Sequence, residues 1–257
     1  MKCKPTVKDI FEFINSIAPF EKQCEWDNSG FLVGNADEEV SKIGVVLDIT
    51  NDAIKHASEN GINLIVSHHP VIFGGLKTVL ADDPTYSLIK NGISAICAHT
   101  SLDIAKGGVN DALAEALGFS NVKPLSDIGE TEMVRIAEIN PISGEQLAKL
   151  CANKLSTCVS VADSGKTIKK VALCGGAGGD FLHDAAEADC DAYITGEAKH
   201  HEFLDAKAIG ITLISAGHFE TENPVVTVLA EKLRDNFDCE VEIIPQESPV
   251  KYYSKED

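Results

Sequence analysis

The amino-acid sequence predicts an α/β fold of mixed sheets flanked by helices. The first observation is that short β-branched runs alternate with segments of helical periodicity along the 257 residues, a rhythm typical of βα units rather than of a sandwich or a bundle. The second is that proline or glycine closes several of the helical segments. The third is a hydrophobic content of 44%, which is enough for one large core or two smaller ones.

The first half of the chain contains one helix and then two βα units. Apolar residues recur at helical spacing from Val7 to about Ala18, between the capping Thr6 and the terminating Pro19. The segments that follow are strand 43–47, helix 51–60, strand 63–67, helix 85–91, strand 93–98 and helix 109–117. Each of these three helices is followed by a glycine, namely Gly61, Gly92 and Gly118.

The pattern restarts near residue 124 and indicates a second domain. Strand 133–139 precedes helix 144–155, which Ser143 caps with Gln146 three residues on. The remaining segments are strands 158–162 and 171–174, helix 181–188, strand 192–195, helix 203–208, strand 212–215, helix 224–236 and strand 240–244. Asn223 caps the last helix, and Pro224 takes its first position. We expect the boundary between the halves near residues 117–123.

Composition excludes several classes of protein. Forty acidic residues against 22 basic ones give a formal charge of −18, which repels a phosphate backbone and disfavours nucleic acid as a partner. No stretch approaches the roughly 18 apolar residues of a membrane helix, and no secretory signal is evident, so we expect a cytoplasmic protein. The eight cysteines have neither CxxC pairs nor dense spacing, which indicates free thiols.

Two adjacent histidines follow an apolar strand in the first half of the chain. His68 and His69 come directly after strand 63–67, at the carboxyl edge where open α/β sheets place their ligands. Pro70 favours an extended backbone at His69, so the two imidazoles should point to different sides and serve two neighbouring metals better than one. A chance surface pair is the alternative.

Two further strands end in the same way. Strand 93–98 is followed by His99 and Asp103, and strand 212–215 by His218 and Glu222. Asp103 is a suitable oxygen ligand for a divalent ion, although it could simply begin a turn. His218 and Glu222 could reach one metal if the segment between them wraps like a helical turn.

The three clusters together predict an open metal site rather than a structural zinc site. Imidazole and carboxylate ligands suit zinc, iron, manganese or nickel, and no cluster contains cysteine. Two metals about 3.5–4 Å apart can share a bridging carboxylate, an arrangement that hydrolyses phosphate esters and amide-like bonds.

Five motifs carry a resemblance to the Nif-three-like family, the type 2 GTP cyclohydrolase I homologs with a dinuclear metal centre. They appear in the family's order across nearly the whole chain. The motifs are Trp26-Asp27-Asn28-Ser29-Gly30 with Val33-Gly34, SHHPVIF at 67–73, HTSLD at 99–103, GGAGG at 175–179 and GHFETE at 217–222.

The resemblance implies how the site and the chain are organised. His69, Asp103 and Glu222 would hold one divalent ion, and His68, His218 and Glu222 the other, with Glu222 bridging the two. It also implies a ring-shaped hexamer and two α/β domains, with the metal site at the strands' carboxyl edge between them. The first domain would comprise residues 1–120 and 216–257 and the second residues 121–215. The extra inserted domain of some members has no room here, so any activity that depends on it is in doubt.

Other motif residues have two interpretations each. His201 is similar to a family histidine near the site, but it could equally begin a solvated helix. His99 is either a general base or partner of the ligands, or a buried histidine satisfied by backbone. The loop at 175–179 could present amides to a phosphate, although a tight turn is favoured. No reaction step follows for residues 26–28.

The leading hypothesis is a metal-dependent hydrolase of a nucleotide or related phosphorylated small molecule, with water activated at two zinc, iron or manganese ions. His99 or His201 would assist proton transfer as the catalytic residues. The family label suggests GTP ring opening. The alternatives are a non-catalytic metal carrier or insertase, a hexameric interaction protein, and, against the acidic charge, a DNA-binding ring.

Overall fold

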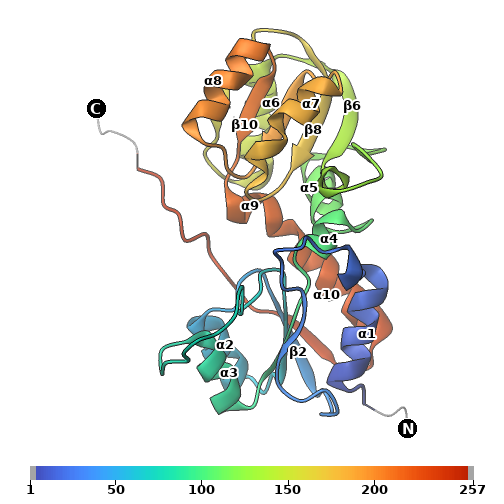
Figure 1. The fold of residues 1–257 in the computed structure, drawn as a ribbon, viewed down its shortest axis with the longest axis vertical. Coiled ribbons are helices and arrows are strands. Elements are labelled where there is room, and N and C mark those ends of the chain that lie inside the picture. Colours follow the sequence, from blue (N-terminus) through green and yellow to red (C-terminus); the bar gives the residue numbers. More distant parts are fainter. Residues whose placement is uncertain (1–3, 254–257) are drawn as a thin grey trace. The chain divides into compact units, whose positions relative to one another are not determined.

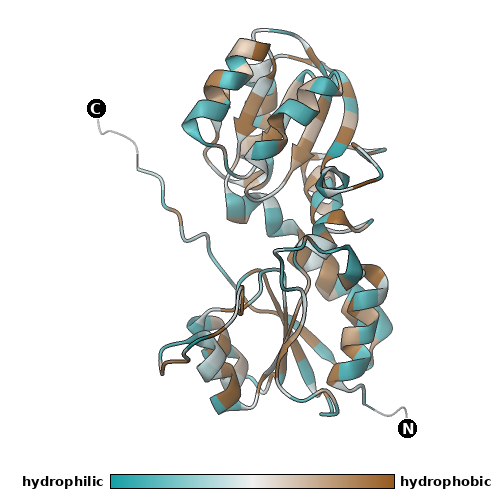
Figure 2. Cartoon of the chain, in the orientation of Figure 1, coloured by the Kyte–Doolittle hydropathy of each residue, from teal (hydrophilic) through white to brown (hydrophobic). Residues whose placement is uncertain are grey.

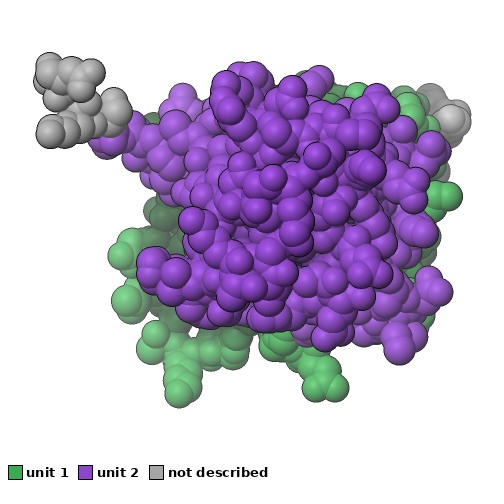
Figure 3. All heavy atoms as spheres, turned by 90° about the horizontal axis from the view of Figure 1, so that it is seen from above, with its two compact units in different colours: residues 1–108, 225–246 green, residues 109–224, 247–257 purple. Residues whose placement is uncertain are grey.

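The computed structural model describes residues 4–253 of the chain. The chain divides into two compact units, residues 1–108 with 225–246 and residues 109–224 with 247–257. Figure 1 labels the elements along the chain, and Figure 3 colours the atoms of each unit separately. Among the helices of residues 4–253, none combines the length and hydrophobicity that crossing a membrane requires.

Unit 1 contains a five-stranded sheet with the order β1-β4-β3-β2-β11. Its strands are β1 (Gly30–Val33), β2 (Lys42–Val46), β3 (Leu64–Ser67), β4 (Ser94–Cys97) and β11 (Glu240–Ile243). Its helices are α1 (Val7–Ile17), η1 (Phe20–Lys22), α2 (Asn51–Glu59), α3 (Pro84–Asn91), α4 (Thr100–Ile104) and most of α10 (Pro224–Asn236). All pairs are parallel except β1 with β4, which is antiparallel.

The register of this sheet brings polar residues to one edge. Val46 of β2 pairs with Ser67 of β3, and Ser67 pairs with Cys97 of β4. The residues that follow these three strands therefore leave the sheet at the same edge. The strands themselves are buried, and Ile65 of β3 packs in a core that α2 and α3 complete. Figure 2 shows the hydrophobic colour along these strands and two-sided colouring on the helices.

Unit 2 contains a six-stranded mixed sheet with the order β5-β6-β8-β9-β10-β7. Its strands are β5 (Lys123–Pro124), β6 (Arg135–Ile142), β7 (Ser160–Ala162), β8 (Ile168–Cys174), β9 (Ala192–Thr195) and β10 (Thr212–Ser215). Its helices are α5 (Val109–Leu117), η2 (Glu130–Met133), α6 (Gly144–Leu155), η3 (Gly178–Phe181), α7 (Leu182–Glu187), α8 (His200–Ile209) and α9 (His218–Glu222).

Strands β8, β9 and β10 form the parallel centre of this second sheet, and antiparallel strands flank them. Leu147 of α6, Ile194 of β9 and Ile214 of β10 lie in one fully buried cluster, to which α5 also contributes. The parallel centre again places the ends of β8, β9 and β10 at a common edge. The loop after each of these strands carries residues of the candidate site.

The structure confirms the predicted α/β class with two mixed sheets. Helix α1 begins after Thr6 with a capping box to Asp9, and α6 begins after Ser143 with a capping box to Gln146. The cysteines in residues 4–253 are all free thiols; Cys3 lies outside the described residues. The predicted strand 133–139 begins at Arg135, since residues 130–133 form a 3₁₀ turn.

Some elements were not predicted. Strand β1 lies in the motif at residues 26–34, for which the sequence predicts no strand. Helices α4 and α9 are single turns, which are too short to show a helical period. Helices α5 and α9 belong to unit 2, whereas the expected first domain included them. The predicted domains, residues 1–120 with 216–257 and residues 121–215, are meant as parts that fold separately. Their boundaries therefore stay a prediction.

Candidate metal site

Three histidines of unit 1 come together at the edge of its sheet. His68 and His69 follow β3, and His99 follows β4. Their ring centroids lie 4.8 Å apart for His68 and His69, 5.1 Å for His68 and His99, and 5.5 Å for His69 and His99. One nitrogen from each ring lies within 4.8 Å of the others, so the three could hold a metal ion. His68 is fully buried, whereas His69 and His99 are partly exposed.

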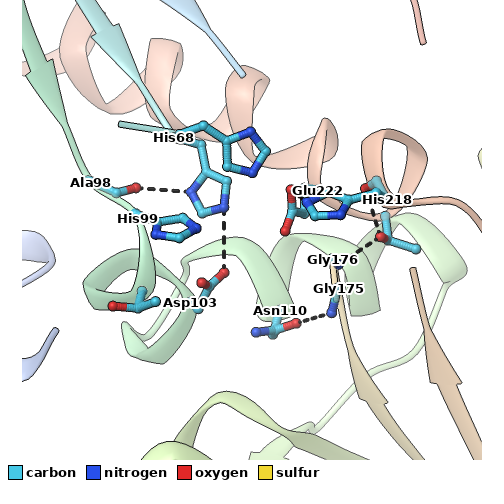
Figure 4. A network of polar contacts seen from close by, with 12 residues as sticks. His68, Ala98, His99, Asp103, Asn110, Gly175, Gly176, His218 and Glu222 are labelled. Carbon is cyan, nitrogen blue, oxygen red and sulfur yellow. Dashed lines mark hydrogen bonds and ion pairs between the residues drawn. The ribbon is translucent and has the colours of Figure 1, made fainter. Parts of the chain in front are cut away.

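Asp103 adds a carboxylate to the same group. It lies in α4, whose first turn begins directly after His99, and its backbone N–H donates to the His99 carbonyl. Its Oδ1 lies 3.8 Å from His68 Nε2, as the dashed line in Figure 4 shows. The short helix thus returns the chain toward the histidines. The histidine beside Asp103 is thus His68, whereas the family resemblance implied His69.

Unit 2 holds the second pair of predicted ligands on one helical turn. His218 and Glu222 are the first and last residues of α9, and His218 Nε2 lies 3.1 Å from Glu222 Oε2. The helical turn that the pair required is therefore present. The Glu222 side chain is only 6% exposed, so its charge is largely withdrawn from water. A buried carboxylate is stabilised by a charged partner or by a metal ion, and the His218 imidazole is one such partner here.

The four histidines of these two groups, His68, His69, His99 and His218, all direct Nδ1 to an oxygen acceptor. His68 Nδ1 lies 3.0 Å from the Ala98 carbonyl oxygen, which Figure 4 shows. The other three meet carboxylates: His69 Nδ1 with Asp48 at 2.7 Å, His99 Nδ1 with Asp27 at 2.8 Å, and His218 Nδ1 with Glu197 at 2.9 Å. Each of these contacts fixes the proton on Nδ1, which leaves Nε2 with the lone pair that a metal ion requires. Metal-binding histidines in proteins are held in this way.

Sequence reasoning missed the roles of these carboxylates. Asp48 follows strand β2, and Glu197 follows strand β9, each two residues beyond the end of a buried strand. The rule that located the histidines, a polar residue just after an apolar strand, would have found both. Asp27 lies in the Trp26-Asp27-Asn28-Ser29-Gly30 motif, to which the sequence assigns no reaction step.

Asp27 is a buried anion that fixes the orientation of His99. Its side chain has no exposure, and it accepts hydrogen bonds from Ser29 Oγ, the Asn28 N–H and the Thr100 N–H at 2.7–3.0 Å, besides His99 Nδ1. Burial raises the pKa of the Asp27 carboxyl, but the hydrogen bonds from His99 and Thr100 outweigh burial and hold that pKa well below its ordinary value. The carboxylate is therefore charged at neutral pH and keeps His99 Nδ1 protonated.

The glycine-rich loop at 175–179 packs against Glu222. The amides of Gly175, Gly176 and Gly178 donate to Asn110, Thr221 and Thr195, respectively, and Figure 4 shows the first two contacts. Gly176 has a φ of +61°, and a Cβ there would lie 2.0 Å from Glu222 Oε1. These three amides thus donate within unit 2, as the interpretation of a tight turn leads one to expect.

Of the two predicted catalytic histidines, only His99 has a defined setting. It belongs to the unit 1 histidine group and is held by Asp27. His201 is exposed on the first turn of α8, and its catalytic role stays a prediction. His68, His69, His99 and Asp103 lie in unit 1, and His218, Glu222 and His201 in unit 2.

Comparisons with known proteins cover nearly the whole chain. The family model for Duf34/NIF3 (NGG1p interacting factor 3) matches residues 5–249. A protein of Clostridium perfringens named "GTP cyclohydrolase 1 type 2 homolog" is 34% identical over 248 residues, which are 93% of this chain and 95% of that protein. A protein of Campylobacter jejuni with the same name is 36% identical over 256 residues, which are 96% and 99% of the two chains.

Solved structures show the same fold. A hypothetical protein from Staphylococcus aureus superposes with a TM-score of 0.89 at 27% identity and covers 97% of this chain and 100% of its own. Reduced HcgD from Methanocaldococcus jannaschii superposes with a TM-score of 0.81 at 31% identity and covers 93% of this chain and 97% of its own.

Proposed function

This chain belongs to the Duf34/NIF3 family, and on that premise we propose that it is a cytoplasmic, dinuclear metal-dependent hydrolase of a nucleotide or a related phosphorylated small molecule. The observation that carries the proposal is the common orientation of four histidines, each with Nδ1 on an oxygen acceptor. A histidine that serves only the core needs no such uniform arrangement, whereas a metal site does.

The proposed ligands are His68, His69 and Asp103 from unit 1 and His218 and Glu222 from unit 2. Because Asp103 Oδ1 lies beside His68 Nε2, one ion would be held by His68, Asp103 and Glu222, and the other by His69, His218 and Glu222. The donor set fits this proposal, because it offers imidazole nitrogens and carboxylate oxygens and no thiolate, as zinc, iron and manganese sites without a structural role do. The buried charge of Glu222 suits a bridging position between two cations.

Divalent ions in such a site polarise the reacting phosphoryl or carbonyl oxygen and lower the pKa of water. The residues of the chain supply orientation and proton transfer. Asp27 keeps the proton on His99 Nδ1, so Nε2 is available to accept a proton from water and return it to the leaving group. His201 is the second candidate for this role. The relatives' printed name points to GTP, which is therefore the first substrate to test.

The deciding experiment begins with elemental analysis of protein purified without chelator. The metal that it carries is then restored at full occupancy, and GTP, other nucleotides and simple phosphoesters are screened for hydrolysis. We expect turnover that is lost in the Glu222→Ala variant and kept in an Asp52→Ala control, which changes an exposed acid of α2. Bound metal that passes to an apo-acceptor without turnover of any substrate would identify a metal carrier instead.

We also propose that the protein assembles as a homohexamer, as the family resemblance implies. Light scattering at micromolar concentration should then report about six times the chain mass of 27.5 kDa. A stable mass near that of one chain would contradict the hexamer and would leave the proposal of a metal site unaffected.

A further inference from the structure

Two large aromatic side chains in unit 1 stack on each other in solvent. Trp26 is 54% exposed and Phe73 is 56% exposed, yet their ring centroids lie 5.8 Å apart with an interplanar angle of 28°. Leaving so much aromatic surface in water forgoes the free energy that burial would contribute. Exposed aromatic surface that is ordered in this way is typical of a binding site.

The aromatic pair borders the histidine group of the same unit. The Trp26 and Phe73 rings each meet the His99 ring edge-on, with centroids 5.9 Å apart in both cases. His99 in turn lies beside His68 and His69. A ligand that stacks on the pair would therefore have its other end within reach of the residues proposed to hold metal.

A cavity adjoins the pair. It has a volume of about 490 Å³, and its lining residues are Asp27, Asn28, Ile72, Phe73, Gly74 and Gly75, with Leu76 at its end. This volume lies within the range of about 300–1,000 Å³ that is usual for small-molecule sites. The cavity is large enough for a planar ring system and lies within unit 1.

The two rings are held in place by a polar contact between their segments. Asn28 Nδ2 donates to the Ile72 carbonyl oxygen at 2.6 Å, which links the turn that carries Trp26 to the loop that carries Phe73. Asp27, between Trp26 and Asn28, is anchored by its bonds to His99 and Thr100. The stacking surface is thus preorganised, which reduces the entropy lost when a ligand binds.

Two glycines beside Phe73 have no structural requirement for glycine. A Cβ at Gly74 or Gly75 would meet no atom within 4 Å, and neither residue has a positive φ. Glycine at such positions lets a ligand approach the backbone closely. Their place on the cavity wall therefore leaves the backbone beside Phe73 open to a ligand.

We propose that Trp26 and Phe73 form a stacking subsite for a planar heteroaromatic ring of nucleobase type, which seats in the adjoining cavity. The inference deepens the proposed function and rests on it, since it names the part of the substrate that is bound away from the metal ions. Aromatic side chains bind bases through their π-faces with little dependence on which base is present. The subsite thus selects a class of ring and leaves the chemistry to the histidine group.

The test uses the intrinsic fluorescence of the chain, because Trp26 is its only tryptophan. Guanosine and adenosine, which carry the ring without phosphate, should quench this fluorescence saturably in the metal-loaded, full-length protein. Ribose 5-phosphate, which carries phosphate without the ring, should not. Phe73→Leu should raise the Kd of the nucleosides about tenfold and leave the metal content unchanged. Tyr86→Leu, which removes an exposed aromatic side chain from α3, should leave the Kd unchanged.

A second variant tests the cavity itself. Gly75→Val should weaken nucleoside binding at least as much as Phe73→Leu does, while the urea midpoint of unfolding stays the same. The subsite is overturned if neither nucleosides nor free heteroaromatic bases quench the fluorescence at concentrations up to millimolar. It is also overturned if the fluorescence changes only with protein concentration, because a second copy of the chain would then cover the rings. Metal binding and phosphoester hydrolysis that survive such a result would show that the proposed function stands without the subsite. Quenching in a protein that binds no metal would instead contradict the proposed function.

Discussion

Glu222 and His218 face each other across one turn of α9, with Oε2 of the carboxylate 3.1 Å from Nε2 of the imidazole. The spacing of four residues in a helix is what places the two side chains on one side. Because Glu197 occupies His218 Nδ1, the nitrogen that faces Glu222 is the one left for a metal. The carboxylate and the imidazole could therefore hold one ion together.

Loss of Glu222 should affect both proposed metal ions, whereas loss of Asp103 should affect one. Glu222→Ala removes a ligand from each ion and also the negative charge that offsets their mutual repulsion. We expect Asp103→Ala to retain about half of the metal and Glu222→Ala to retain less. Elemental analysis after dialysis against dilute chelator measures this, and circular dichroism confirms that each variant is folded. Two metals per chain in Glu222→Ala would exclude Glu222 as the bridge.

Removal of Asp48 should weaken metal binding although Asp48 is not a proposed ligand. Its carboxylate holds His69 Nδ1 at 2.7 Å and so sets the ring orientation and the tautomer. Loss of such a partner typically costs about 10- to 100-fold in metal affinity. Competition with a chromogenic chelator would measure the change in Asp48→Ala, and Asp52→Ala serves as the control. Equal affinities in the two variants would show that His69 is oriented by other contacts.

A methyl group at Gly176 should displace the Glu222 carboxylate. Gly176→Ala places a Cβ 2.0 Å from Oε1 and also strains a residue with φ of +61°. Gly118→Ala provides the matched control, since Gly118 has a φ of +84° but no atom within 4 Å of the added Cβ. Both variants should lose about 1–2 kcal/mol of stability through backbone strain. Only Gly176→Ala should lose metal, and metal loss in both variants would attribute the effect to strain alone.

The Asp27 carboxylate should make unfolding dependent on pH in acid. Its pKa in the folded protein lies below its ordinary value, so it contributes stability that is present above the unfolded pKa of about 3.9 and is lost as the pH falls below it. Asp27→Asn should be less stable at pH 7 by about 1–3 kcal/mol, and its stability should fall less between pH 5 and pH 3 than that of the unchanged protein.

Urea unfolding at several pH values measures this dependence. Asp37→Asn is the control, because Asp37 is an exposed acid of the same unit. An identical acid dependence in Asp27→Asn and in the unchanged protein would mean that other carboxylates dominate acid unfolding.

Local signals account for the elements that were predicted well. Thr6 and Ser143 cap their helices through contacts three residues away, and strands β9 and β10 have the bounds that their short apolar runs predicted. The single turns α4 and α9 lack such signals, since a helix of five residues has too few positions to show a period. Strand β1 exists because it pairs with β4, and pairing with a distant strand leaves no mark in the local pattern.

The sequence by itself determined the α/β class, the family, and the histidines and carboxylates that follow the strands. These features can be predicted because apolar periodicity, helix caps and strand ends depend on residues that are close together in the chain. Only the tertiary structure decided which partner each histidine has. Asp27 lies 72 residues from His99, and Asp48 lies 21 residues from His69, so neither contact can be read from spacing. Sheet pairing brings those segments together, and the orientation of each imidazole follows from the acceptor that the pairing supplies.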